Sequence, residues 1–245
     1  MTRKKRKRKD PMHYLIILCA ELVVMLVLLI LCTKVFPDNP ITRSIVSLVT
    51  PQADVILDAG HGGYDTGSSY ENIYEKDITL SLTKKIGKAL EQKGVHVAYT
   101  RESDDVNWPA DEVADLTKRV EISNTSNAKL FVSIHTNASD YGSEPYGFEI
   151  WGKIKDEASF TLAKNVAAQM DALHYTQNRG IKDQDIAPLQ VLQENALPAI
   201  LIEAGFLANE NDRNYLMNEA NQQALANKIA QGIYADLKQM EASTE

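Results

Sequence analysis

The chain has 245 residues, of which 24 % are charged and 44 % hydrophobic, with 12 Gly, 8 Pro and 2 Cys. These fractions exclude collagen-like, disordered and disulfide-scaffold proteins, and the length allows one sizeable domain or two small ones. The net charge of −7 hides an asymmetry, because residues 1–50 hold nine of the 26 basic residues and three of the 33 acidic ones. The remaining 17 basic and 30 acidic residues give residues 51–245 a net charge of −13. Such an acidic domain is unsuited to binding nucleic acid by neutralising phosphates, and this class of function is excluded.

The N-terminal segment has the pattern of a membrane anchor. Seven of the first nine residues are Lys or Arg, and residues 12–32 are apolar except for Glu21 and a few small or mildly polar positions. A helix over this run would be roughly 31 Å long, about the thickness of the hydrocarbon core of a membrane. A buried core helix rarely lacks a polar face over such a length, so a transmembrane helix is expected. Because basic flanks stay on the cytoplasmic side, residues 1–11 are expected inside the cell and the rest outside.

The span is expected to remain uncleaved. The apolar run is longer than the core of a signal peptide, and Leu31-Cys32-Thr33-Lys34 offers no small-x-small cleavage site. The sequence therefore predicts a single-pass protein of the cell membrane with a signal anchor. Residues 33–52, which contain three prolines, are expected to form a stem. Both cysteines fall in the predicted span, so the exported part has no disulfide.

Residues 53–245 have the pattern of a single α/β domain. Short apolar runs alternate with segments of helical periodicity. The expected strands include residues 55–57, 95–100, 130–134, 148–151 and 199–202, and the expected helices include residues 75–92, 116–122 and 157–173. A helix-rich tail is expected over residues 211–240. Strands separated by helices of this length predict a mostly parallel sheet with helices on both faces.

Reactive side chains follow three of the expected strands. His61 lies in a glycine-rich loop, His135 follows the run at 130–134, Glu203 follows the run at 199–202, and Glu75 opens the helix after the glycine loop. Loops at the carboxyl ends of strands carry the reactive groups in sheets of this kind. Two imidazoles and one carboxylate around an open position are a common catalytic Zn²⁺ set, and a second carboxylate can deprotonate water there.

Each of these residues also has a structural interpretation. A lone histidine at a strand end is often only hydrogen-bonded, Glu75 could complement a helix dipole, and Glu203 could be a buried carboxylate bound by backbone N–H groups. Spacing does not decide, since 14 residues separate His61 from Glu75 and a further 60 separate Glu75 from His135. The residue types alone leave both interpretations open.

Five segments in order resemble one enzyme family. They are LDAGHGGYD at 57–65, EK at 75–76, TR at 100–101, SIHTNA at 133–138 and EAGFL at 203–207. Together they resemble the zinc-dependent N-acetylmuramoyl-L-alanine amidases, the amidase-3 family of cell-wall hydrolases. The resemblance runs from about residue 54 to residue 233, nearly all of the expected catalytic domain at 53–245.

The resemblance implies a bacterial enzyme that cleaves the amide between N-acetylmuramic acid and L-alanine of the peptidoglycan stem peptide. It implies one Zn²⁺ per domain, with His61, Glu75 and His135 as ligands and Glu203 as the general base acting on zinc-activated water. It also implies a sheet of six strands flanked by helices.

Further residues are weaker candidates. Asp58 is expected to orient His61, as carboxylates often do for zinc-bound imidazoles, although it could equally cap a turn. Asn137 and Arg179 fall where the family places polar residues near the substrate groove. Residues 102–115 form a longer acidic segment that could contact substrate or be a solvated loop. His13, His96 and His174 belong to no motif and are expected to be bystanders.

Two other functions stay open from the sequence. The first is another zinc-dependent cell-wall peptidase, because metal chemistry does not identify the acyl side of the bond. The second is a non-catalytic wall-binding regulator, which would be expected to lack one of the four site residues. Protein partners, oligomeric state and cellular role have no signal in the sequence.

Overall fold

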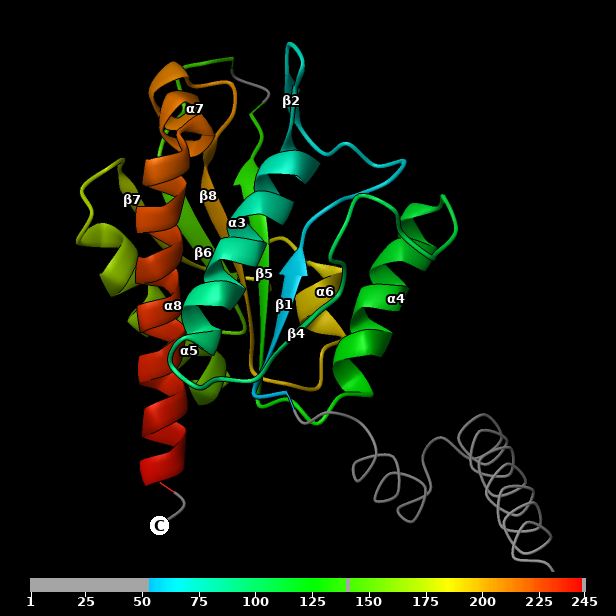
Figure 1. Ribbon diagram of the computed structural model, residues 1–245, viewed down its shortest axis with the longest axis vertical. Coiled ribbons are helices and arrows are strands. Elements are labelled where there is room, and N and C mark those ends of the chain that lie inside the picture. The colour runs from blue at the N-terminus through cyan, green and yellow to red at the C-terminus, as the bar shows by residue number, and fades with distance from the viewer. Residues whose placement is uncertain (1–52, 140–141, 244–245) are drawn as a thin grey trace, which may run out of the picture. The chain divides into compact units, whose positions relative to one another are not determined.

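Six strands form a mixed central sheet in the computed structural model, which describes residues 53–139 and 142–243. The strands are β1 (Val55–Ala59), β4 (Val97–Tyr99), β5 (Leu130–Asn137), β6 (Phe148–Gly152), β7 (Asn178–Asp183) and β8 (Ala199–Phe206), in the spatial order β4-β1-β5-β8-β6-β7. β4, β1, β5 and β8 are parallel, β6 runs antiparallel to β8, and β7 is parallel to β6. The parallel strands end at one edge of the sheet, the upper edge in Figure 1.

Helices cover both faces of the sheet (Figure 1). The helices are α3 (Glu75–Glu91), α4 (Glu112–Asn124), α5 (Glu157–Asp171), α6 (Gln190–Gln193), α7 (Glu210–Met217) and α8 (Glu219–Ala242). α8 packs between α3 and α5 on one face, while α4 and α6 contact each other on the opposite face. A short hairpin of β2 (Ser69–Tyr70) and β3 (Ile73–Tyr74) precedes α3.

Alternation along the strands explains the two layers. On β5, Val132 and Ile134 belong to the core cluster beneath α3, α5 and α8, whereas Phe131 belongs to the smaller cluster beneath α4 and α6. Successive side chains of a strand point to opposite faces, so a continuous apolar run serves both layers. On α3, Ile78, Leu82 and other apolar residues at helical spacing form the stripe that meets the larger core.

The structure confirms the mixed α/β domain with a six-stranded sheet and flanking helices, and differs in detail. β5 and β8 extend beyond their apolar runs, so that His135 and Glu203 are strand residues rather than loop residues. β7 was not predicted because its sequence, NRGIKD, is mainly polar. The helix-rich tail consists of two helices, α7 and α8, separated at Asn218, which caps the second.

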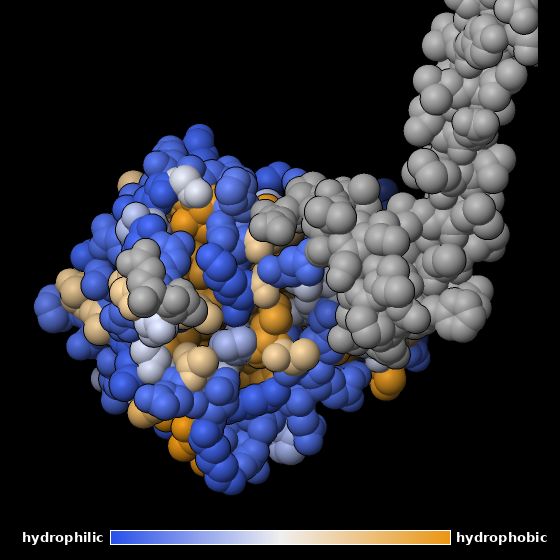
Figure 2. Space-filling view, turned by 90° about the horizontal axis from the view of Figure 1, so that it is seen from below, coloured by the Kyte–Doolittle hydropathy of each residue, from blue (hydrophilic) through white to orange (hydrophobic). Residues whose placement is uncertain are grey.

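The predicted membrane segment lies outside the described residues, as do the predicted cytoplasmic tail and the predicted stem. Across the part of the chain that the structure describes, no helix combines the length and apolarity needed to cross a membrane. The face of the domain seen from below is mostly hydrophilic, with apolar areas between hydrophilic residues (Figure 2).

Candidate active site

Three side chains from distant parts of the chain meet at the carboxyl ends of β1 and β5. His61 lies in the loop after β1, Glu75 is the first residue of α3, and His135 lies on β5. Glu75 Oε1 is 3.2 Å from His61 Nε2 and 3.1 Å from His135 Nδ1. One ligand atom from each residue lies within 4.8 Å of the other two.

This donor set fits a zinc ion. A tetrahedral Zn²⁺ with ligands at about 2.0–2.1 Å holds neighbouring ligand atoms roughly 3.3 Å apart, close to the two separations from Glu75 Oε1. Two imidazole nitrogens and one carboxylate oxygen are also the ligand types of catalytic zinc sites, which keep a fourth position for water or substrate. His61, Glu75 and His135 could therefore hold one metal ion.

Two glycines make room for these ligands. A Cβ atom on Gly60 would lie 2.3 Å from the ring of His135, and one on Gly67 would lie 2.5 Å from the ring of His61 and 2.7 Å from Glu75 Oε2. Gly67 also has a φ of +64°, a conformation that glycine adopts at little cost. The glycine-rich pattern thus reflects close approach of the backbone to the imidazoles.

Asp65 binds the second nitrogen of His61. Asp65 Oδ2 is 2.6 Å from His61 Nδ1, and its other oxygen accepts a hydrogen bond from the Gly67 N–H. A carboxylate on one imidazole nitrogen leaves the other free for a metal and fixes the ring orientation. Asp65 was not predicted as a site residue, although it lies four residues after His61 in the same glycine-rich loop.

Asp58, the residue expected to orient His61, lies elsewhere. It is fully buried on β1 opposite Ser133 of β5. Its carboxylate accepts hydrogen bonds from Ser133, Thr100 and Arg119. The strand directs Asp58 across the sheet, whereas the turn of the following loop brings Asp65 back to the imidazole.

Glu75 is held in its ionised form. Its Oε1 accepts a hydrogen bond from the Thr136 N–H and its Oε2 accepts one from the Ser68 N–H, both at 2.8 Å. Burial alone would raise the pKa of Glu75, but the hydrogen bonds and charges of His135 and His61 lower it well below its ordinary value. Glu75 therefore needs no deprotonation in order to bind a cation.

His61 holds a proton strongly in the metal-free protein. Burial lowers its pKa, but hydrogen bonds and the negative charges of Glu75 and Asp65 outweigh burial and raise the pKa to about 9. A metal ion at Nε2 must replace this proton, so metal binding and proton release are linked.

Glu203 lies next to His135 at the site. β5 and β8 pair with His135 opposite Glu203, which places the two side chains on the same face of neighbouring strands. Glu203 is partly exposed, yet its Oε2 is buried and has no hydrogen-bond partner among the described residues. Burial, and then the charges of Glu75 and Glu149, raise the pKa of Glu203 well above its ordinary value. This carboxyl group is suited to taking up and releasing a proton.

Glu149 is a further acidic residue that the sequence analysis missed. It lies on β6 opposite Glu203 of β8 and is only 6 % exposed. Its carboxylate accepts hydrogen bonds from Asn137 Nδ2 and Arg179 Nε, both at 3.0 Å, and from Trp151 Nε1 at 3.2 Å. Its only signal in the sequence was a charge inside an apolar run.

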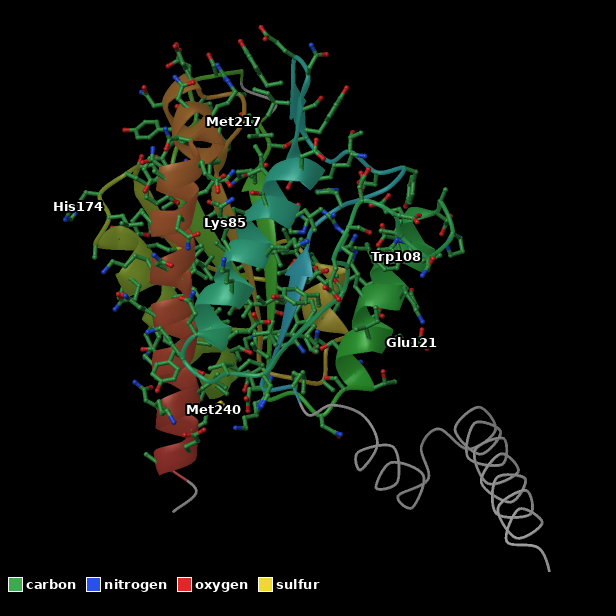
Figure 3. All side chains as sticks on the ribbon, viewed as in Figure 1. Lys85, Trp108, Glu121, His174, Met217 and Met240 are labelled. Carbon is green, nitrogen blue, oxygen red and sulfur yellow. The ribbon has the colours of Figure 1, made fainter. Side chains whose placement is uncertain are left out.

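Asn137 and Arg179, the two other candidates, meet at this carboxylate. The Arg179 guanidinium also lies over the ring of Phe206, with 5.0 Å between Cζ and the ring centroid. Its side chain is 34 % exposed, so Glu149 fixes a partly accessible cation from β7, two strands from Glu203. By contrast, His96 pairs with Asp54, and His174 lies at the outer edge of the domain (Figure 3).

Comparisons with known proteins agree with this architecture. Residues 55–235 match the family described as N-acetylmuramoyl-L-alanine amidase. The chain is 32 % identical over 188 residues to the germination-specific N-acetylmuramoyl-L-alanine amidase of Bacillus subtilis, a match that covers 73 % of this chain and 77 % of the relative. It is 35 % identical to the endolysin of Bacillus phage SPP1, covering 73 % of this chain but only 64 % of the endolysin.

A solved structure has the same fold. The CwlD amidase of Clostridioides difficile, in complex with the GerS lipoprotein, superposes with a TM-score of 0.69 at 35 % identity. The superposition covers 75 % of this chain and 98 % of that enzyme.

Proposed function

The chain belongs to the N-acetylmuramoyl-L-alanine amidase family, and we propose that it hydrolyses the amide between N-acetylmuramic acid and L-alanine of the peptidoglycan stem peptide. The observation that carries this proposal is the convergence of His61, Glu75 and His135, with Glu203 beside them, inside the segment that matches the family.

The three converging residues are proposed to hold one Zn²⁺, through His61 Nε2, Glu75 Oε1 and His135 Nδ1. When bound, zinc lowers the pKa of water and polarises a carbonyl group. Glu75 contributes an ionised carboxylate, and Asp65 fixes the tautomer of His61 in which Nε2 is available.

Glu203 is proposed to carry the proton. As a carboxylate it accepts a proton from the water that attacks the amide carbon. As the resulting acid it donates this proton to the leaving nitrogen when the C–N bond breaks. The products are a carboxylate on the lactyl group of muramic acid and a free amino group on L-alanine. The raised pKa of Glu203 supports both steps, because a carboxylate with a higher pKa is a stronger base.

Asn137 and Arg179 are proposed to contact the substrate next to the scissile bond. Both are fixed by Glu149, which lies one strand from Glu203. A half-exposed guanidinium and a carboxamide offer hydrogen-bond donors of the kind that a peptide with carbonyl and carboxylate groups requires.

We propose that residues 12–32 anchor the enzyme in the cell membrane, with residues 1–11 in the cytoplasm. The basic tail followed by a long apolar run supports this arrangement. Residues 33–52 would then tether residues 53–245 outside the cell, which raises the concentration of the enzyme near the wall. Fractionation of cells and mass spectrometry of the mature N-terminus test the anchor, and a protein lacking residues 1–32 contradicts it.

Digestion of purified peptidoglycan tests the activity. The purified full-length protein is incubated with sacculi, with and without a zinc chelator, and the products are analysed by mass spectrometry. Stem peptides with a free L-alanine amino group, lost on chelation and regained on adding zinc, are expected. New amino groups at any other peptide bond would instead show a cell-wall peptidase, and no cleavage would indicate a binding protein.

A further inference from the structure

Two buried arginines bind three consecutive backbone carbonyls at the start of the metal-binding loop. Arg101 donates from Nε to the Ala59 carbonyl and from Nη2 to the Gly60 carbonyl, both at 2.9 Å. Arg119 donates from Nη1 to the Ala59 carbonyl at 2.7 Å and from Nη2 to the His61 carbonyl at 2.6 Å. The two arginines are only 4 % and 2 % exposed. These bonds fix the peptide planes around His61.

The loop needs such support because its backbone is strained. His61 has a φ of +60°, in the left-handed region that residues with a Cβ atom rarely adopt. Strained residues persist where the surrounding structure holds them, and such positions cluster at functional sites. The direction of the His61 ring depends on this backbone, so whatever fixes the His61 carbonyl also directs Nε2.

Arg119 is itself held by residues 102–115, the segment whose role the sequence left open. Asp115 Oδ1 accepts a hydrogen bond from Arg119 Nε at 2.6 Å, and the guanidinium lies 5.2 Å from the Trp108 ring. Figure 3 shows Trp108 near the upper end of α4. The Asp58 carboxylate completes the set at 2.7 Å from Arg119 Nη1.

The same segment contacts the loop at a second point. Asp104 accepts hydrogen bonds from the Gly63 N–H at 2.9 Å and from Lys76 Nζ at 2.7 Å. A Cβ atom on Gly63 would lie 2.7 Å from Val106, so the segment packs directly on the glycine loop. These contacts favour a brace over the alternative of a free, solvated loop.

We propose that Arg119 is a positioning residue for the metal ligand His61, and that residues 102–115 act through Arg119 as a brace for the metal-binding loop. The inference rests on the proposed zinc site. Arg119 is too buried to reach substrate; its effect passes through the His61 carbonyl. If Arg119 loses its hydrogen bonds to the Ala59 and His61 carbonyls, the imidazole of His61 can leave the orientation needed to bind the metal. The hydrophobic core of the domain would stay packed.

Zinc affinity and coordination geometry test the proposal in the full-length protein. Arg119→Lys keeps the charge, but one ammonium group cannot serve Asp115, Asp58 and two carbonyls together. Competition with a chromophoric chelator gives the zinc dissociation constant, and the electronic spectrum of the cobalt(II)-substituted protein reports the ligand geometry. We expect zinc binding to weaken by about tenfold to a hundredfold and the cobalt bands to shift. Lys118→Gln, a partly exposed neighbour on α4 whose ammonium group pairs with Glu121, serves as the control and is expected to match the wild type in both measurements.

A second variant keeps the test decisive. Asp115→Asn leaves Arg119 in place but neutralises its partner, and a weaker loss of about threefold to tenfold in zinc affinity is expected. This variant decides the matter where Arg119→Lys does not fold. The positioning role is overturned if Arg119→Lys keeps the zinc affinity and the cobalt spectrum of the wild type. If Arg119→Lys does not fold, the same result in Asp115→Asn overturns it. Such a result leaves the proposed function intact, provided that the wild-type protein binds one zinc and cleaves peptidoglycan.

Discussion

The half of the site that is proposed to bind the metal and the acidic half beside it are built in different ways. The first half depends on a loop, in which a strained His61, close-packed glycines and Asp65 direct one imidazole. The second depends on strand register, which places Glu203 between His135 on β5 and Glu149 on β6. Loop geometry needs many specific contacts, whereas register is held by the whole sheet. Substitutions near the loop should therefore change metal affinity. Substitutions of the acidic residues on β8 and β6 should instead change turnover and substrate binding.

The largest loss of metal affinity is expected for Gly60→Ala. The new Cβ atom would lie 2.3 Å from the His135 ring, so the ring must leave its position. We expect zinc affinity to fall by more than about a hundredfold, beyond the effect of losing a supporting residue. Gly152→Ala is the control, since its Cβ atom would meet its nearest neighbour at an ordinary 3.5 Å. Unchanged zinc affinity in Gly60→Ala would show that His135 does not bind the metal from this position.

Asp65→Asn should weaken zinc binding by about tenfold, because it removes the negative charge that fixes the tautomer of His61. Chelator competition measures the change. Asp185→Asn, which removes an exposed carboxylate paired with Lys155, is the matched control. Equal zinc affinities in the two variants would contradict the assigned role of Asp65.

Zinc binding should strengthen as the pH rises. Below its pKa of about 9, His61 in the metal-free protein carries a proton that the metal must displace. Each unit of lower pH should therefore weaken binding by about tenfold while one proton is released. Calorimetric titrations in buffers of different ionisation enthalpy at several pH values measure this proton. Zinc affinity that does not change with pH would refute the linkage.

Glu149→Gln should have the smallest effect, and it should appear in KM. In the new side chain an NH₂ group, which cannot accept hydrogen bonds, replaces one of the two carboxylate oxygens. The hydrogen bond from Arg179 Nε is therefore weakened, and the guanidinium is less firmly held. We expect KM to rise by about threefold to tenfold with zinc affinity unchanged. Exposed Glu144→Gln serves as the control. A loss of zinc instead would mean that the two halves of the site are not separable.

The sequence predicts the elements that hydrophobic periodicity controls. β1, α3, β5 and β8 were expected because each has an apolar pattern that the core requires. β7 was not predicted, because a mainly polar strand at the edge of a sheet buries little surface and so shows no apolar periodicity. The antiparallel direction of β6 could not be predicted either, because it depends on how the chain connects the strands and not on the residues of β6.

At the site, residue type was informative where an unusual residue interrupted a pattern. His61, Glu75, His135 and Glu203 could be named in this way, with the family resemblance distinguishing them from structural residues. The sequence could not show that Asp65, and not Asp58, orients His61, since both flank the same glycine loop. Only the path of the loop brings Asp65 to the His61 imidazole.

The central claim is that zinc binding and proton transfer belong to different side chains. Parallel measurement of zinc content and amide cleavage in Glu203→Gln tests it most directly, because this variant keeps the shape of the side chain while removing the base. The account predicts one zinc per chain, as in the wild type, and cleavage reduced by at least about a hundredfold. Cleavage at the wild-type rate with zinc still bound would contradict it.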